Sequence, residues 1–150
     1  MKTVQKNKVL AVISWTFVAI VAFIIFKFSC DTAEESAEIS ETLLDIIIEF
    51  IGNLIGHETF REFAHFCEFA ALGFFMAGSF KFTWDKLKVY LPLIPCALYA
   101  VSDEIHQIFV PGRAFEIFDI FIDSCGSLTG ILVFLLLIFI IEKLMNRKKT

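Results

Sequence analysis

The sequence predicts an all-α integral membrane protein, a bundle of four transmembrane helices with one amphipathic helix on the outer side. Its 150 residues are 57% hydrophobic and only 20% charged, and 19 of them are phenylalanine. Four apolar stretches reach the roughly 20 residues that a membrane span needs, and the basic residues gather beside alternate ends of these stretches. A soluble domain of this size does not bury so much apolar surface. The composition therefore excludes an ordinary cytosolic enzyme and a nucleic-acid binder with a basic face.

The four predicted spans lie in a single domain of residues 1–150. They cover residues 9–26, 63–82, 89–108 and 117–141. The first span is interrupted only by Ser14 and Thr16. A cleaved signal peptide is the alternative for it, which its length and the lack of a small-residue cleavage site disfavour. The other three spans carry ionisable residues near one end, and such residues usually face a protein interior and mark function.

Basic residues set the predicted orientation, because cytoplasmic loops carry an excess of Lys and Arg. Ten of the 13 basic residues fall on one side of a four-span chain: Lys2, Lys6, Lys8, Lys81, Lys86, Lys88, Lys143, Arg147, Lys148 and Lys149. Only Lys27, Arg61 and Arg113 fall on the other side. We therefore expect a multi-pass membrane protein with both termini in the cytoplasm.

An amphipathic helix is predicted for the outer segment, residues 32–56. Its apolar residues recur at helical spacing, among them Leu43, Ile47, Phe50, Ile51 and Leu54, and Glu41, Asp45 and Glu49 form an acidic stripe opposite them. Two alternatives are open for this helix. It packs over its own bundle as a lid, which the width of the apolar face favours, or it binds a partner.

Polar side chains fall at a common depth in three of the predicted spans, and we call this set the polar layer. It comprises His65, Glu68, Asp103, Glu104, His106, Gln107, Asp119 and Asp123. Most lie roughly 6–15 Å to the outer side of the midplane at 1.5 Å rise per residue. Spacings of three or four residues place His65 with Glu68, and Asp119 with Asp123, on shared helix faces. Glu104 is turned about 100° from Asp103, so we expect only one of the two to face the interior.

This convergence favours a ligand-binding or catalytic pocket that opens to the outside. Asp119 and Asp123 must share a proton, meet a cation or reach solvent, and Arg61 and Arg113 are the cations at that face. An arginine there neutralises the aspartates or binds a phosphate or carboxylate. For Glu104, Gln107 and Glu116, mutual satisfaction at a helix end is the better interpretation.

No metal site is predicted, since no tight ligand motif accompanies the histidines and carboxylates. The cysteines Cys30, Cys67, Cys96 and Cys125 lack paired spacing. The last three are expected to be small buried side chains within spans, and Cys30 has no obvious partner. No cofactor is assigned from the sequence.

Three blocks of the sequence resemble the VanZ-like family of bacterial membrane proteins. Residues Arg61 to Gly73 are similar to R-K-x-x-H-F-x-E-Y-x-x-L-G, and Ser102 to Arg113 to S-D-E-x-H-Q-x-F-V-P-G-R. Residues Asp119 to Gly126 are similar to D-x-x-x-[DN]-x-x-G. The order of the blocks agrees with the family, and the resemblance covers about residues 61–141.

The resemblance implies a role at the outer face of a bacterial cytoplasmic membrane, because the family is named for a protein that gives resistance to the glycopeptide antibiotic teicoplanin. The expected partners are the lipid bilayer and either a lipoglycopeptide or an anionic envelope lipid or precursor. The protein would bind the drug or modify an envelope component.

In the enzymatic version, the candidate catalytic residues are His65, Glu68, Asp103 and His106, with a histidine as acid or base and a carboxylate orienting it. The candidate ligand-binding residues are Arg61, Gln107, Arg113, Asp119 and Asp123. The alternative is a non-enzymatic binding or scaffold protein whose polar layer is structural. A transporter is a third reading, disfavoured by the small number of spans.

Overall fold

A computed structural model describes residues 2–32, 57–85 and 88–147 of the chain. These residues form four α-helices and no strand: α1 (Lys2–Ser29), α3 (His57–Trp84), α4 (Tyr90–Gln107) and α5 (Ile117–Arg147). The all-helical fold class is confirmed for this part of the chain. The amphipathic helix expected over residues 32–56 lies outside the described residues, apart from Thr32.

Three of the described helices are long and apolar enough to cross a membrane: Lys8–Ser29, Arg61–Trp84 and Ile117–Arg147. Large apolar side chains remain exposed along them, as at Val12 and Leu136, which are 66% and 58% exposed. Such surfaces are suited to lipid, so the helices support a membrane protein. The 18 residues of α4 span about 27 Å at 1.5 Å per residue, slightly less than a ~30 Å hydrocarbon core.

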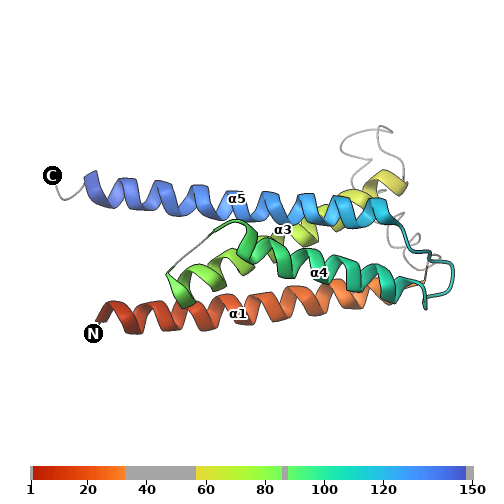
Figure 1. Ribbon diagram of the computed structural model, residues 1–150, viewed down its shortest axis with the longest axis horizontal. Helices are drawn as coiled ribbons and strands as arrows, with labels where there is room; N and C mark the ends of the chain where they lie inside the picture. The colour runs from red at the N-terminus through yellow and green to blue at the C-terminus, as the bar shows by residue number, and fades with distance from the viewer. Residues whose placement is uncertain (1, 33–56, 86–87, 148–150) are drawn as a thin grey trace, which may run out of the picture.

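The helices run alternately up and down, so α3 and α5 point in the same direction and α1 and α4 in the other (Figure 1). Both chain ends lie at one end of the bundle (Figure 1). The opposite end, where α1 and α4 finish and α3 and α5 begin, is called the site end below. Because α3 and α5 are parallel, the chain must return between them, and α4 makes that return.

The closest packing in the bundle joins α3 to α5 through glycines. A Cβ atom on Gly126 would meet the backbone carbonyl of Phe66, and one on Gly130 would meet the backbone of Ala70. From the other side, a Cβ atom on Gly73 would meet the backbone of Ser127. Small residues spaced by four allow two membrane helices to approach at backbone distance. The small-residue face predicted for the fourth span is therefore a packing surface against α3.

Helix α1 packs on α3 and α4 rather than on α5. Phe17 of α1 stacks on Phe75 of α3 with ring centroids 4.7 Å apart. The Tyr99 hydroxyl of α4 donates a 2.6 Å hydrogen bond to the backbone carbonyl of Ala22. Val18 and Ile25 of α1 are buried in the same apolar cluster as residues of α3 and α4. These contacts anchor the end of α1 next to α4 at the site end.

Short-range signals end α3 and shape the loop before α5. Asp85 adopts a left-handed conformation (φ 52°) directly after α3, which is a common way for a helix to end. Between α4 and α5, the Arg113 N–H donates to the Val110 carbonyl at 3.1 Å, and Gly112 has φ 77°. A turn with proline second and a positive-φ glycine third is a type II turn, and it delivers Arg113 to the site end.

The glycine packing predicts a sharp difference between two small substitutions. In Gly130→Ala the new Cβ would overlap the Ala70 backbone, and overpacking of this kind costs about 1–3 kcal/mol. We expect a clear fall in the thermal unfolding midpoint of the detergent-solubilised protein. Gly78→Ala is the matched control, because the nearest atoms that its Cβ would meet belong to side chains, the Ser14 hydroxyl at 3.1 Å and the Phe134 ring at 3.3 Å, and not to the backbone. Equal midpoints for the two variants would contradict the packing described here.

Candidate functional site

One ion pair and one histidine–aspartate contact join α3 to α5 at the site end. Arg61 Nη2 lies 3.6 Å from Asp119 Oδ2, and one helical turn further His65 Nδ1 lies 3.8 Å from Asp123 Oδ1. The partners are 58 residues apart in both pairs, and the glycine contacts continue the same register along the two helices. The glycine packing therefore sets which α3 side chain faces which aspartate.

Asp123 is the most enclosed carboxyl group of the site. It is fully buried, and neither of its oxygens has a hydrogen-bond partner among the described residues. His65 Nδ1 is also buried without such a partner, since 3.8 Å is longer than a hydrogen bond. Buried polar groups in native proteins are normally satisfied, so this pair has unused hydrogen-bonding capacity.

Helix α4 adds two buried carboxyl groups. Asp103 is 4% exposed; it accepts a 3.3 Å hydrogen bond from Gln107 Nε2 and is reached by the Ser29 hydroxyl. Glu104 is fully buried. Its Oε2 accepts the backbone N–H of Glu116 at 2.8 Å, and its Oε1 has no partner in the described part of the chain.

The expectation that only one of Asp103 and Glu104 faces the interior is wrong. Helix α4 packs against α1, α3 and α5, so more than one of its faces is covered and neighbouring residues can both be buried. The interpretation of Gln107 as a satisfied helix-end residue agrees with its bond to Asp103, whereas Glu104 is satisfied at only one oxygen.

Glu68 stands on α3 one turn beyond His65, at intermediate burial. Its carboxyl is close enough to Asp103 and Asp123 for their charges to repel one another. The site therefore concentrates acidic side chains from three helices at one level of the bundle.

Arg113 reaches the same region from the loop before α5. Its Nε donates to the Asp31 carbonyl at 3.4 Å, while its buried Nη1 has no hydrogen-bond partner among the described residues. Burial lowers the pKa of Arg113 below its usual value, and the nearby Arg61 guanidinium lowers it further. Arg61 Nε is likewise buried and unpartnered in the described part of the chain. Two guanidinium groups thus lie close together, each with an unused N–H.

His106 does not lie beside His65. It faces the end of α1, where Nδ1 lies 3.3 Å from Ser29 Oγ and Nε2 lies 4.0 Å from Cys30 Sγ, and its ring packs on Phe26 at 5.1 Å. A position three residues after Asp103 is rotated by about 60° around the helix, which is enough to aim it at α1. Cys30 had no predicted partner and Ser29 was not among the candidate residues, although both end the first span at the level of the polar layer.

We call the group that the structure brings together the polar cluster. It consists of Arg61, His65, Glu68, Asp103, Glu104, Gln107, Arg113, Asp119 and Asp123, so it includes every candidate residue from the sequence except His106. Within residues 2–32, 57–85 and 88–147, no group of three His, Cys, Asp or Glu side chains is arranged to hold a metal ion. What the polar cluster offers is a set of hydrogen-bond donors and acceptors that lack partners.

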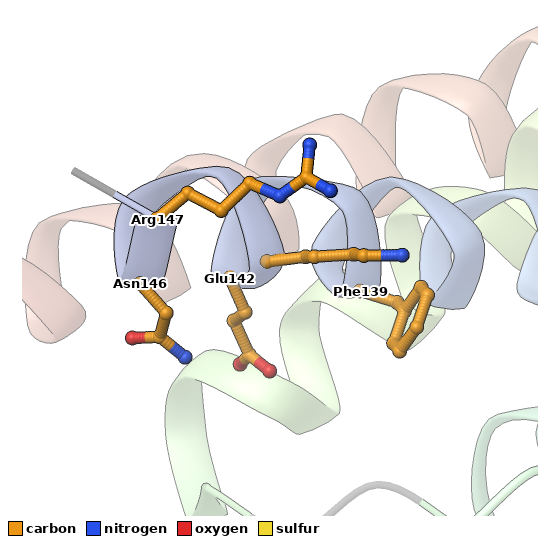
Figure 2. A pocket seen from close by; sticks show the side chains of 5 residues that line it. Phe139, Glu142, Asn146 and Arg147 are labelled. Carbon is orange, nitrogen blue, oxygen red and sulfur yellow. The ribbon is translucent and has the colours of Figure 1, made fainter. Parts of the chain in front are cut away.

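A groove of about 500 Å³ lies at the other end of the bundle, on the last turns of α5 (Figure 2). It is lined by Phe139, Glu142, Lys143, Asn146 and Arg147. Asp123 and Phe139 are 16 residues apart on one helix, or about 24 Å at 1.5 Å per residue. The groove is therefore separate from the polar cluster, and its charged residues provide matched controls for substitutions in the cluster.

Comparison with known protein families gives a match over most of the chain. The VanZ/LLP1 family model matches residues 13–139, which includes most of the first span as well as the three blocks noted in the sequence. A search of curated proteins and a search of solved structures found no match. Because this match covers more than half of the chain, and with it the whole polar cluster, the chain belongs to the VanZ/LLP1 family.

Proposed function

We propose that this protein lowers the susceptibility of a bacterium to teicoplanin-type lipoglycopeptides, and that the polar cluster is its working part. Membership of the VanZ/LLP1 family supports an association with glycopeptide resistance at the level of the family. The protein would act at the outer face of the cytoplasmic membrane, by binding the drug or by binding or modifying an envelope component.

The observation that carries this proposal is the unused hydrogen-bonding capacity of the polar cluster. The fully buried Asp123 has two oxygens without partners among the described residues, and His65 and Arg61 each add a nitrogen in the same condition. A buried polar group left unsatisfied costs about 1–3 kcal/mol. A ligand that satisfies several such groups together would recover that free energy on binding.

Binding is favoured over catalysis by the position of His106. Of the two histidines proposed as acid or base, only His65 faces the aspartates of α5, whereas His106 lies against the end of α1 and is linked to Asp103 of its own helix through the Ser29 hydroxyl. A catalytic version would therefore rest on His65 with Asp123, while Arg61 and Arg113 hold the anionic part of the substrate.

We also propose four membrane crossings, with both termini in the cytoplasm and the polar cluster towards the outside. The parallel course of α3 and α5 supports this, because α4 must return the chain along the bundle between them (Figure 1). The concentration of lysine and arginine near the two termini and the α3–α4 connection supports the orientation.

Asp123→Asn tests the role of the polar cluster in resistance. A sensitive Gram-positive host would carry empty vector, wild type, Asp123→Asn or Glu142→Gln, with membrane levels matched by immunoblot. Glu142→Gln is the control, since it also exchanges a carboxyl for an amide on α5 but lies in the distant groove. We expect wild type and Glu142→Gln to raise the minimal inhibitory concentration of teicoplanin, and Asp123→Asn to lose that protection. Protection kept by Asp123→Asn would rule out a working role for this carboxyl.

Thermal stability separates a working cluster from a structural one. If Asp123 serves binding, the Asp123→Asn protein in detergent should keep or raise its unfolding midpoint, because functional sites often hold unfavourable buried groups. If the cluster only fixes helix packing, the same variant should unfold at a clearly lower temperature. A large fall in the midpoint would favour the scaffold alternative.

Single-cysteine labelling tests the orientation. In a chain without Cys67, Cys96 and Cys125, we expect the exposed Cys30 to react with a membrane-impermeant maleimide in intact cells. The matched chain also lacks Cys30 and carries Arg147→Cys at the other end of the bundle; it should react only after permeabilisation. The reverse pattern would overturn the proposed orientation.

A further inference from the structure

The unpartnered atoms of the polar cluster fall into two complementary kinds. Arg61 Nε and Arg113 Nη1 are donors that lack an acceptor among the described residues. Glu104 Oε1 and both oxygens of Asp123 are buried acceptors that lack a donor there. The two kinds meet at one place, since Asp119 pairs with Arg61 and also lies close enough to influence Arg113, Glu104 and Asp123 electrostatically.

The charges of the cluster do not balance among themselves. Its two guanidinium groups face four buried carboxyl groups, those of Asp103, Glu104, Asp119 and Asp123. A buried charge is costly unless it is paired and hydrogen-bonded. Additional donors or positive charge are needed near the carboxyl groups, and an additional acceptor is needed near the arginines.

We propose that the polar cluster binds a zwitterionic group, in which a phosphate or carboxylate engages Arg61 and Arg113 and a neighbouring ammonium engages Asp123 and Glu104. This inference deepens the proposed function and rests on it, because it names the chemical class of the ligand at the same site. Guanidinium groups are well matched to phosphate and carboxylate oxygens, and an ammonium brings three donors for the carboxyl oxygens.

Simpler ligands leave half of the cluster unsatisfied. A plain anion would satisfy the arginines but add negative charge beside four carboxyl groups. A plain organic cation would satisfy the carboxyl groups but leave the arginine N–H groups without an acceptor. A zwitterion satisfies both kinds, because its anionic group pairs with the arginines while its ammonium places donors and positive charge beside the carboxyl groups.

Two sources can supply this chemistry at a membrane surface: the headgroup of a phosphoethanolamine lipid, or a water-soluble zwitterion. The site end combines the cluster with exposed apolar side chains, among them Phe109 and Ile108, which are 80% and 55% exposed. A ligand with a zwitterionic group and an acyl chain therefore fits this end of the bundle.

The first measurement needs no variant. The full chain in detergent would be titrated with phosphoethanolamine, with glycerol 3-phosphate as the anion alone, and with ethanolamine as the cation alone, following the unfolding midpoint. Binding to the folded state raises the midpoint by mass action. We expect phosphoethanolamine to bind at least about tenfold more tightly than either single-charge probe, because each of those forgoes one set of charged hydrogen bonds. Equal affinities for phosphoethanolamine and glycerol 3-phosphate would overturn the inference.

Variants then assign the two halves of the ligand. Asp123→Asn and Glu104→Gln should remove the preference for phosphoethanolamine over glycerol 3-phosphate, whereas Arg113→Gln should weaken both phosphate probes. Glu142→Gln and Arg147→Gln, from the distant groove, should leave all affinities unchanged. A preference that persists in both carboxyl-to-amide variants would refute the assignment of the ammonium to Asp123 and Glu104.

The two sources are separated in nanodiscs and by competition. Lipid as the source predicts tighter retention of phosphatidylethanolamine than of phosphatidylglycerol or of phosphatidylcholine, whose ammonium has no N–H. A soluble source predicts that teicoplanin displaces bound phosphoethanolamine without any lipid preference. If phosphatidylethanolamine is not preferentially retained and teicoplanin does not displace phosphoethanolamine, the inference is rejected.

These outcomes are independent of the susceptibility test. Loss of protection in Asp123→Asn without zwitterion binding would remove the ligand class and keep the proposed function. Zwitterion binding without protection by wild type would keep the ligand class and remove the proposed function.

Discussion

The backbone contact between α3 and α5 determines the positions of the other functional elements. Gly126 and Gly130 lie against Phe66 and Ala70 with no room for a side chain, so the two helices have one register available at this distance. That register places Arg61 beside Asp119 and His65 beside Asp123. Helix α4 then closes the site from the third side, with Asp103 and Glu104 buried against its neighbours. The polar cluster is thus a consequence of apolar packing deeper in the bundle.

Much of this fold could be predicted from hydropathy and charge, because a membrane span is a property of one continuous segment. Three spans agree in position with α1, α3 and α5. The pairing of α3 with α5 was only hinted at by Gly126 and Gly130, since a small-residue face shows that a partner approaches but does not identify it. The predicted span over residues 89–108 agrees in position with α4, although α4 is not among the described helices that are long and apolar enough to cross a membrane.

The members of the candidate site were largely predictable, whereas their contacts were not. Equal depth in the bilayer selected His65, Asp103, Asp119 and Asp123 without knowledge of helix rotation. The rotation of each helix about its axis decides which contacts these side chains make. In α4 it turns His106 towards Ser29 and Cys30 and leaves both Glu104 and Asp103 buried. Spacing within one helix fixes which residues share a face, but only the packing of several helices decides how wide a buried face is. The width of the buried face of α4 explains why Glu104 is buried next to Asp103 and why His106 contacts α1.

The parallel pairing of α3 and α5 also sets an order of events during synthesis. Arg61 and His65 emerge from the ribosome 58 residues before the aspartates that face them. At 5–20 residues per second, α3 waits roughly 3–12 s before its partner helix exists. During that interval its charged turn has no counterion on α5, and ionisable groups are costly in a bilayer. The contacts of Arg61 and His65 with α5 can therefore form only after residues 119–123 have been synthesised.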